Sequence, residues 1–174
     1  MAVPQPSLSK EFALGLRDLM AGSVAREMET TKKVLAAIPD ARSREYRPDP
    51  KARTGFELAW HLVSTEVQLL DEIADGKFNM EPRFQEPKTV SEMLAWYESN
   101  LPRALARVRA LDDKHLTKPV DFYGTFNYPA VYYLGFVTSH SIHHRGQLST
   151  YLRPMGARVP SIYGGSADEE WKAA

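Results

Sequence analysis

The first regular pattern along the chain is a helical stripe that begins near Ser9. Spacings of three and four residues place on one face Phe12, Leu16, Leu19, Ser23, Glu27, Thr30, Val34 and Ile38. Ser9 is a suitable N-cap, and Pro39 ends the predicted helix. The middle of the stripe is polar, and polar groups on an inward face need water, a partner or a ligand. Either this face lines a pocket, or the stripe drifts off the core and its polar residues lie at the surface.

A capping-box pattern marks the start of the second predicted helix. Thr54 and Glu57 have the spacing at which each side chain accepts a hydrogen bond from a free backbone N–H of the helix start. The helix is apolar most of the way round, so we expect it to be buried. Gly76 can end it in the left-handed conformation. Residues 47–50, which precede the helix, contain two prolines and are expected to be extended.

The second half of the chain predicts two more helices with a long connection between them. Thr89 and Glu92 repeat the capping-box spacing at the start of the third helix. Residues 112–128 are polar and aromatic, which indicates a crossover with a short extended piece. Pro129 begins the fourth helix. Four helices of roughly 20 to 28 residues favour an all-α four-helix bundle with a long crossover connection, forming a single domain over residues 1–174.

Composition narrows the classes of function. The chain has 174 residues with 22 basic and 22 acidic side chains, whereas proteins that bind nucleic acid usually carry a basic excess. We therefore expect no nucleic-acid partner. The absence of cysteine excludes disulfides, iron–sulfur clusters, Cys-bound zinc and a cysteine nucleophile. We find no basic-then-apolar leader and no apolar run long enough to span a bilayer, so we expect a cytoplasmic protein with no membrane partner.

The sharpest chemical signal lies in the fourth helix, at His140 and His144. Positions four apart differ by about 40° around a helix axis, so both imidazoles project from one face and can bind one metal ion. His143 points about 100° away from His144 and does not share that face. A third ligand must come from another helix, and His61 is the remaining candidate because His115 lies in the crossover. A lone histidine in an apolar helix is otherwise more often a hydrogen-bonded core residue.

The segments around these histidines form a longer pattern. They read RP at 47–48, ELAWHL at 57–62, HSIHHRGQL at 140–148, YLRPMG at 151–156 and VPSIYG at 159–164. On these segments the chain resembles the DinB/YfiT-like family of four-helix-bundle metalloproteins. The resemblance implies a site for one divalent transition metal ion, such as zinc or nickel, with His61, His140 and His144 as ligands. It also implies a homodimer.

The resemblance points to a class of function as well. Characterised members of this family include S-transferases that use bacillithiol or mycothiol, and a maleylpyruvate isomerase. Three neutral ligands leave a divalent ion its full charge, and such an ion can bind and deprotonate a thiol or a water molecule. Because the chain has no cysteine, a thiolate nucleophile must arrive with a co-substrate. The hypothesis is therefore a metal- and thiol-dependent S-transferase or isomerase acting on a small electrophile. The alternatives are a metal-dependent hydrolase and a non-catalytic stress protein that binds a metal or a small ligand.

Two further residues are candidates for the catalytic machinery. Glu27 is the one carboxylate on the polar part of the first stripe, and it could accept a proton from the nucleophile. The alternative for Glu27 is a salt bridge to a neighbouring Arg or Lys. Gln147 lies on the histidine face of the fourth helix and could line the pocket. Arg145 either pairs with an acidic group or binds an anionic substrate, and we favour the pairing.

Overall fold

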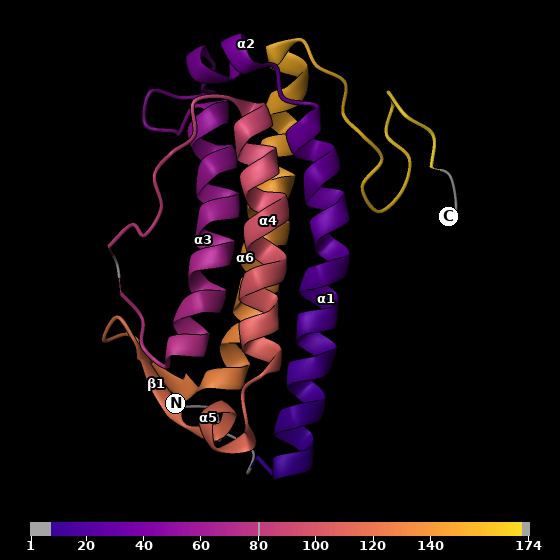
Figure 1. The fold of residues 1–174 in the computed structure, drawn as a ribbon. Helices are drawn as coiled ribbons and strands as arrows, with labels where there is room; N and C mark the ends of the chain where they lie inside the picture. The colour runs from indigo at the N-terminus through magenta and orange to yellow at the C-terminus, as the bar shows by residue number, and fades with distance from the viewer. Residues whose placement is uncertain (1–7, 80, 172–174) are drawn as a thin grey trace.

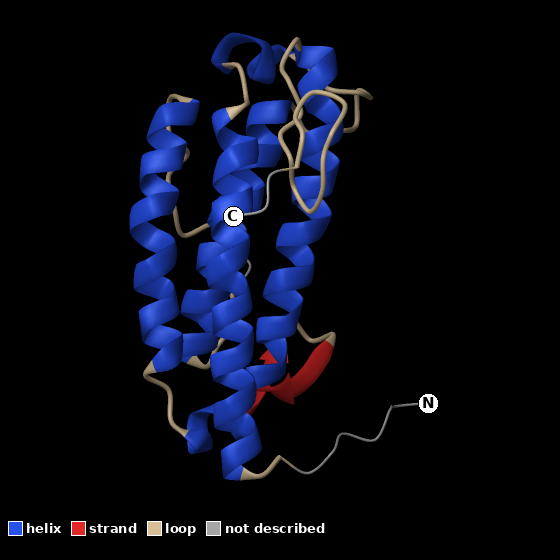
Figure 2. Ribbon diagram, turned by 90° about the vertical axis from the view of Figure 1, so that its right-hand side faces the viewer, coloured by secondary structure: helices blue, strands red, loops and turns tan. Residues whose placement is uncertain are grey.

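The computed structural model describes residues 8–79 and 81–171, and four long helices make up most of it (Figure 1). They are α1 (Lys10–Ala36), α3 (Gly55–Asp75), α4 (Val90–Arg109) and α6 (Tyr133–Leu152). Their axes run side by side in both views (Figures 1 and 2). Helices α1 and α3 each pack against both α4 and α6, so α1 and α3 lie diagonally opposite each other. The all-α four-helix bundle expected from the sequence is confirmed.

The short elements lie at the two ends of the bundle (Figure 1). Helix α2 (Asp40–Glu45) lies at the end where α3 begins. The crossover between α4 and α6 contains α5 (Asp113–Thr117) and an antiparallel hairpin of β1 (Pro119–Phe122) and β2 (Phe126–Pro129), red in Figure 2. Single 3₁₀ turns, η1 (Ala130–Tyr132) and η2 (Arg153–Met155), flank α6. The extended piece expected in the crossover is confirmed, whereas α2 was not predicted.

The helix ends follow the local sequence signals. The side chain of Ser9 caps α1, and the capping box of Thr54 and Glu57 is complete at the start of α3. Oγ1 of Thr89 caps α4 by accepting a hydrogen bond from the backbone N–H of Glu92, but the Glu92 carboxylate accepts from the N–H of Lys88, so the second capping box is only half formed. Gly76 ends α3 with a φ of 68°, a left-handed conformation in which a side chain would be strained. Among the described residues, no helix is long and apolar enough to cross a membrane.

The inward stripe expected for α1 is wrong in the N-terminal half of the helix. Phe12 and Leu19 are 54% and 59% exposed. The buried face consists instead of Ala13, Ala21, Val24, Met28, Thr31, Val34 and Leu35. Small residues at the contact let a neighbouring helix approach closely, so the interface follows the alanines and not the largest side chains. Ser23, Glu27 and Thr30 are half-buried at the edge of this face.

Four polar side chains, one from each long helix, lie buried inside the bundle. Nη1 of Arg145 donates a 3.1 Å hydrogen bond to Oγ1 of Thr31. The hydroxyl of Tyr97 donates a 2.8 Å hydrogen bond to Oε2 of Glu66 and lies within hydrogen-bonding reach of Thr31. Buried polar groups need such partners, because water does not reach them there. This cluster ties α1, α3, α4 and α6 together at one level of the bundle.

Candidate metal centre

Three histidines from two helices converge between α3 and α6. Nε2 of His61 lies 3.2 Å from Nε2 of His144 and 3.3 Å from Nε2 of His140. One ligand nitrogen from each ring lies within 4.8 Å of the other two, and all three residues are half-buried. His143 is exposed, and His115 contacts the backbone of α3 from the crossover. The structure therefore brings together the three histidines that the sequence grouped and leaves the other two outside.

The distances from Nε2 of His61 to Nε2 of His140 and of His144 fit one metal ion. Two nitrogens bound to a tetrahedral ion at about 2.0–2.1 Å lie roughly 3.3 Å from each other. The separations from Nε2 of His61 are 3.2 and 3.3 Å. A set of three imidazoles suits zinc, nickel or a similar divalent transition metal and leaves a coordination position open for a substrate.

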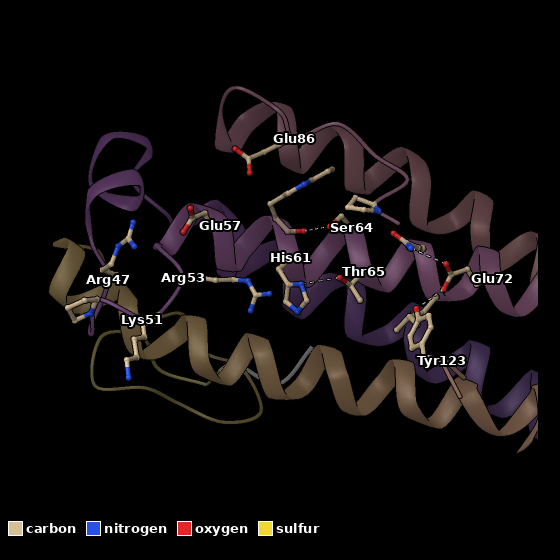
Figure 3. Close-up of a pocket in the computed structure, with 16 residues that line it drawn as sticks. Arg47, Lys51, Arg53, Glu57, His61, Ser64, Thr65, Glu72, Glu86 and Tyr123 are labelled. Carbon is tan, nitrogen blue, oxygen red and sulfur yellow. Dashed lines mark hydrogen bonds between the residues drawn. The ribbon is translucent and has the colours of Figure 1, made fainter. Parts of the chain in front are cut away.

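The outer nitrogens of two rings contact side chains about one turn further along the same helix. Nδ1 of His144 lies 3.1 Å from Oε1 of Gln147, and Nδ1 of His61 lies 3.2 Å from Oγ1 of Thr65 (Figure 3). The amide oxygen can only accept, so Nδ1 of His144 carries the proton and its Nε2 presents a lone pair. Such outer contacts fix the tautomer and orientation of metal-binding histidines. Gln147, a candidate site residue, thus contacts the histidine cluster from outside.

The three histidines are held in the neutral form. Burial, and after it the neighbouring histidines, lower the pKa of His140 to about 3. Burial, and after it the positive charge of Arg53, lower the pKa of His61 to about 4. The pKa of His144 is lowered by burial as well, against an opposing effect of the Gln147 hydrogen bond. Neutral imidazole is the form that binds a metal ion, so the site stays competent well below neutral pH.

A pocket of about 780 Å³ opens beside His61 (Figure 3). Its long wall is α3, where Trp60, Ser64 and Thr65 join His61. Basic side chains from the connection between α2 and α3 lie at one end, and Tyr123 of the hairpin lies at the other. The pocket is large enough for a small organic molecule, and His61 is the histidine of the cluster that lines it.

Glu27 and Arg145 form an ion pair on the α1 side of α6. Oε2 of Glu27 lies 2.5 Å from Nη2 of Arg145, whose side chain is 1% exposed. The hydroxyl of Tyr163, in the segment after α6, donates a 2.6 Å hydrogen bond to the same carboxylate oxygen and also contacts Arg145. The pairing favoured for Arg145 is confirmed. The catalytic role considered for Glu27 stays a prediction, and the salt bridge considered as its alternative is present.

The family of the chain follows from its sequence. The model of the DinB family matches residues 11–173. The chain belongs to the DinB family. The uncharacterized protein YrdA of Bacillus subtilis (strain 168) is 29% identical to this DinB-family chain over 149 residues, which cover 83% of the chain and 86% of YrdA.

Two solved structures are similar to this DinB-family chain. A DinB-like protein from Bacillus cereus ATCC 10987 superposes with a TM-score of 0.69 at 26% identity, covering 83% of this chain and 95% of that protein. The DinB-like protein YjoA of Bacillus subtilis superposes with a TM-score of 0.64 at 19% identity, covering 79% and 92%. The resemblance stated from the sequence motifs is therefore confirmed at the level of family and fold.

Two features near the site of this DinB-family chain escaped the sequence analysis. Arg53 lies in a short basic segment just before α3. It precedes His61 by eight residues, and this separation alone does not indicate whether the two side chains meet. Glu66 reads as one more polar residue of a helix, yet it is completely buried. The density of basic residues in 47–53 could have pointed to Arg53, whereas only helix packing reveals the burial of Glu66.

Proposed function

We propose that this DinB-family protein binds one divalent transition metal ion through Nε2 of His61, His140 and His144. The observation that supports the proposal is the convergence of these atoms at 3.2 and 3.3 Å. Nδ1 of His144 donates to Gln147, so the Nε2 lone pair of His144 faces Nε2 of His61 and is available to a cation between the rings.

The chemistry we propose is activation of a thiol for attack on a small electrophile. A divalent ion bound by neutral ligands supplies a Lewis acid that lowers the pKa of a thiol or water. Gln147 and Thr65 orient the rings, and burial keeps the histidines unprotonated. With no cysteine in the chain, the thiol enters as a co-substrate through the pocket beside His61. Its sulfur loses a proton and bonds to the electrophilic carbon, and the leaving group departs with its bonding electron pair. If the protein is an isomerase, the thiol adds to the substrate and is released again once the substrate has isomerised.

The test combines a substrate screen with a matched pair of variants. The protein is loaded with zinc or nickel and incubated with low-molecular-weight thiols and a panel of electrophiles, with and without a chelator. We expect thiol consumption that the chelator abolishes. His61→Ala should lose both metal and activity, whereas His143→Ala removes an exposed histidine of α6 outside the cluster and should lose neither. Metal-dependent ester or amide hydrolysis without thiol consumption would favour a hydrolase. Full metal occupancy with no turnover would favour a binding protein.

A further inference from the structure

Three cationic side chains line the end of the pocket where α3 begins. Arg47, Lys51 and Arg53 all come from the connection between α2 and α3, and they gather at the same end in Figure 3. Within residues 8–79 and 81–171, no ion pair includes any of them. The pocket therefore presents positive charge that the described part of the fold does not neutralise by direct contact.

The carboxylates that line the same pocket, in contrast, already have hydrogen-bond or ion-pair partners within the fold. Oε2 of Glu57 accepts a 2.7 Å hydrogen bond from the backbone at the start of α3. Glu72 lies 3.9 Å from Arg83, and Glu86 lies 3.8 Å from Arg44. Glu57 lies at the same end as the three cations. Its pKa is lowered by its hydrogen bond with the Thr54 backbone and also by the charges of Arg47 and Arg53, so it offsets part of their charge. One carboxylate against three cations leaves an excess of positive charge at this end. A ligand that enters this end of the pocket meets a net positive field.

Arg53 is the cation that faces the histidine cluster. Its guanidinium points toward the ring of His61 (Figure 3). A guanidinium next to a site for a divalent cation is electrostatically unfavourable unless an anion lies between the two charges. The planar fork of arginine matches a carboxylate, to which it can donate two parallel hydrogen bonds. The position of Arg53 is thus suited to holding an acidic group of a molecule that reacts at the neighbouring histidines.

We propose that the site takes a carboxylate-bearing organic anion, whose carboxylate is bound by Arg53 in the field of Arg47 and Lys51. This inference deepens the function proposed above, on which it rests, by naming the substrate class of the same site. A carboxylate is favoured over a phosphate because phosphates are typically bound at the free backbone N–H groups of a helix start. At the start of α3 the N–H groups of Thr54 and Glu57 are bound within the capping box, and that of Gly55 donates to the carbonyl of Tyr46.

The test measures binding of succinate, neutral succinamide and inorganic phosphate by titration calorimetry, in zinc-free and zinc-loaded protein. We expect succinate to bind wild type and Arg53→Gln to weaken this binding by about tenfold or more, the usual effect of losing a charge-assisted hydrogen bond. Arg53→Lys keeps the charge but loses the fork, so its affinity should be intermediate. The matched control is Arg26→Gln, which removes an exposed arginine from α1, diagonally opposite α3. That variant should bind succinate as wild type does, and succinamide should not bind.

The inference is overturned if Arg53→Gln binds succinate as well as wild type does. It is also overturned if phosphate binds more than tenfold tighter than succinate, since the ligand class would then be different. Zinc content measured on the same samples separates this inference from the proposed function. A protein that binds no zinc but shows Arg53-dependent succinate binding contradicts the metal-dependent function alone. A zinc-loaded protein whose succinate binding ignores Arg53 contradicts the anion site alone.

Discussion

The hydroxyl of Tyr97 on α4 donates a 2.8 Å hydrogen bond to Oε2 of Glu66 on α3, inside a core that excludes water. In the described part of the chain, Oε1 of Glu66 has no hydrogen-bond partner. Burial of the carboxyl group raises the pKa of Glu66 to about 7, against the opposing effect of the Tyr97 hydrogen bond. A carboxyl group in this position is held close to its point of half-protonation at neutral pH.

We expect Glu66→Gln to remove a pH dependence of stability. The native protein keeps the Glu66 proton up to about pH 7, whereas the unfolded chain releases it near 4.5. Raising the pH from 5 to 8 therefore destabilises wild type relative to the variant, by about 2.5 kcal/mol for a shift of this size. Urea unfolding of both metal-free proteins at the two pH values measures the difference.

The comparison with the variant is needed because the histidines make the free energy of unfolding depend on pH in the opposite direction. Their native pKa values are lowered, so they destabilise the native state as the pH falls from about 6.5 toward 4. Both proteins contain these histidines, so their contribution cancels in the difference. An identical pH dependence in wild type and Glu66→Gln would show that Glu66 does not titrate in this range.

The helices could be predicted because their signals are local. Thr54 and Glu57 specify the start of α3 from a spacing of three residues, and Gly76 specifies its end. The face that α1 presents to the core depends instead on which helices pack against it. Phe12 and Leu19 are therefore exposed even though the sequence placed them on the inward stripe.

The candidate site and its surroundings also contain residues that a local pattern could group and residues that only helix packing brings together. His140 and His144 share a face of one helix, so a local pattern grouped them. His61 was the remaining candidate among the five histidines, and the family resemblance implied it as the third ligand. Glu66 acquires its environment from Tyr97, 31 positions away on a different helix. Helical periodicity cannot place two such residues in contact, because it does not specify which helix faces which.

Metal affinity should depend only weakly on pH between 7.5 and 5.5. Three histidines with an ordinary pKa of 6.5 would lose roughly a thousandfold in affinity over this interval through proton competition. Burial lowers the pKa of His61 to about 4 and that of His140 to about 3, so we expect a loss of less than about tenfold, with a steep decline toward pH 4. Zinc competition titrations against a chelator of known pH dependence measure it. A loss near a thousandfold would mean that the free site titrates like histidines in water.

Gln147→Ala should weaken metal binding without removing a ligand. The 3.1 Å contact between Oε1 of Gln147 and Nδ1 of His144 orients the ring, and losing such an outer contact typically costs about 10- to 100-fold in affinity. Gln85→Ala, which removes an exposed glutamine from the loop before α4, is the control and should bind zinc as wild type does. Unchanged affinity in Gln147→Ala would show that the contact with His144 does not contribute to metal binding.

The homodimer implied by the family resemblance remains a prediction. Large aromatic side chains are exposed near the hairpin, including Phe126 at 46% and Phe136 at 45%. Exposed apolar groups that cluster on one face are often covered by a partner. Light scattering at micromolar concentration should give about twice the chain mass of 19.6 kDa. A mass near that of one chain would contradict the dimer.

Glu27→Ala should destabilise the fold through Arg145. The guanidinium of Arg145 is 1% exposed and pairs with Glu27 at 2.5 Å, so the variant leaves a buried charge without its carboxylate. Losing one partner of a buried pair typically costs about 3 kcal/mol in the free energy of unfolding. Glu29→Ala is the control on the same helix, because the Glu29 side chain is 69% exposed and, within the described part of the chain, forms an ion pair only with Lys32 at the surface. Its cost should stay below about 1 kcal/mol. Urea unfolding of the two variants measures both values.

The catalytic role considered for Glu27 is decided by turnover of Glu27→Gln at full metal occupancy. Oε2 of Glu27 already accepts hydrogen bonds from Arg145 and Tyr163, so both donors tie this carboxylate to the scaffold. We therefore expect turnover within about tenfold of wild type, together with a lower melting temperature. A general base would instead lose about a hundredfold or more in turnover while the metal stays bound. That loss, seen without a fall in melting temperature, would assign Glu27 to proton transfer and make the ion pair with Arg145 part of the reaction machinery.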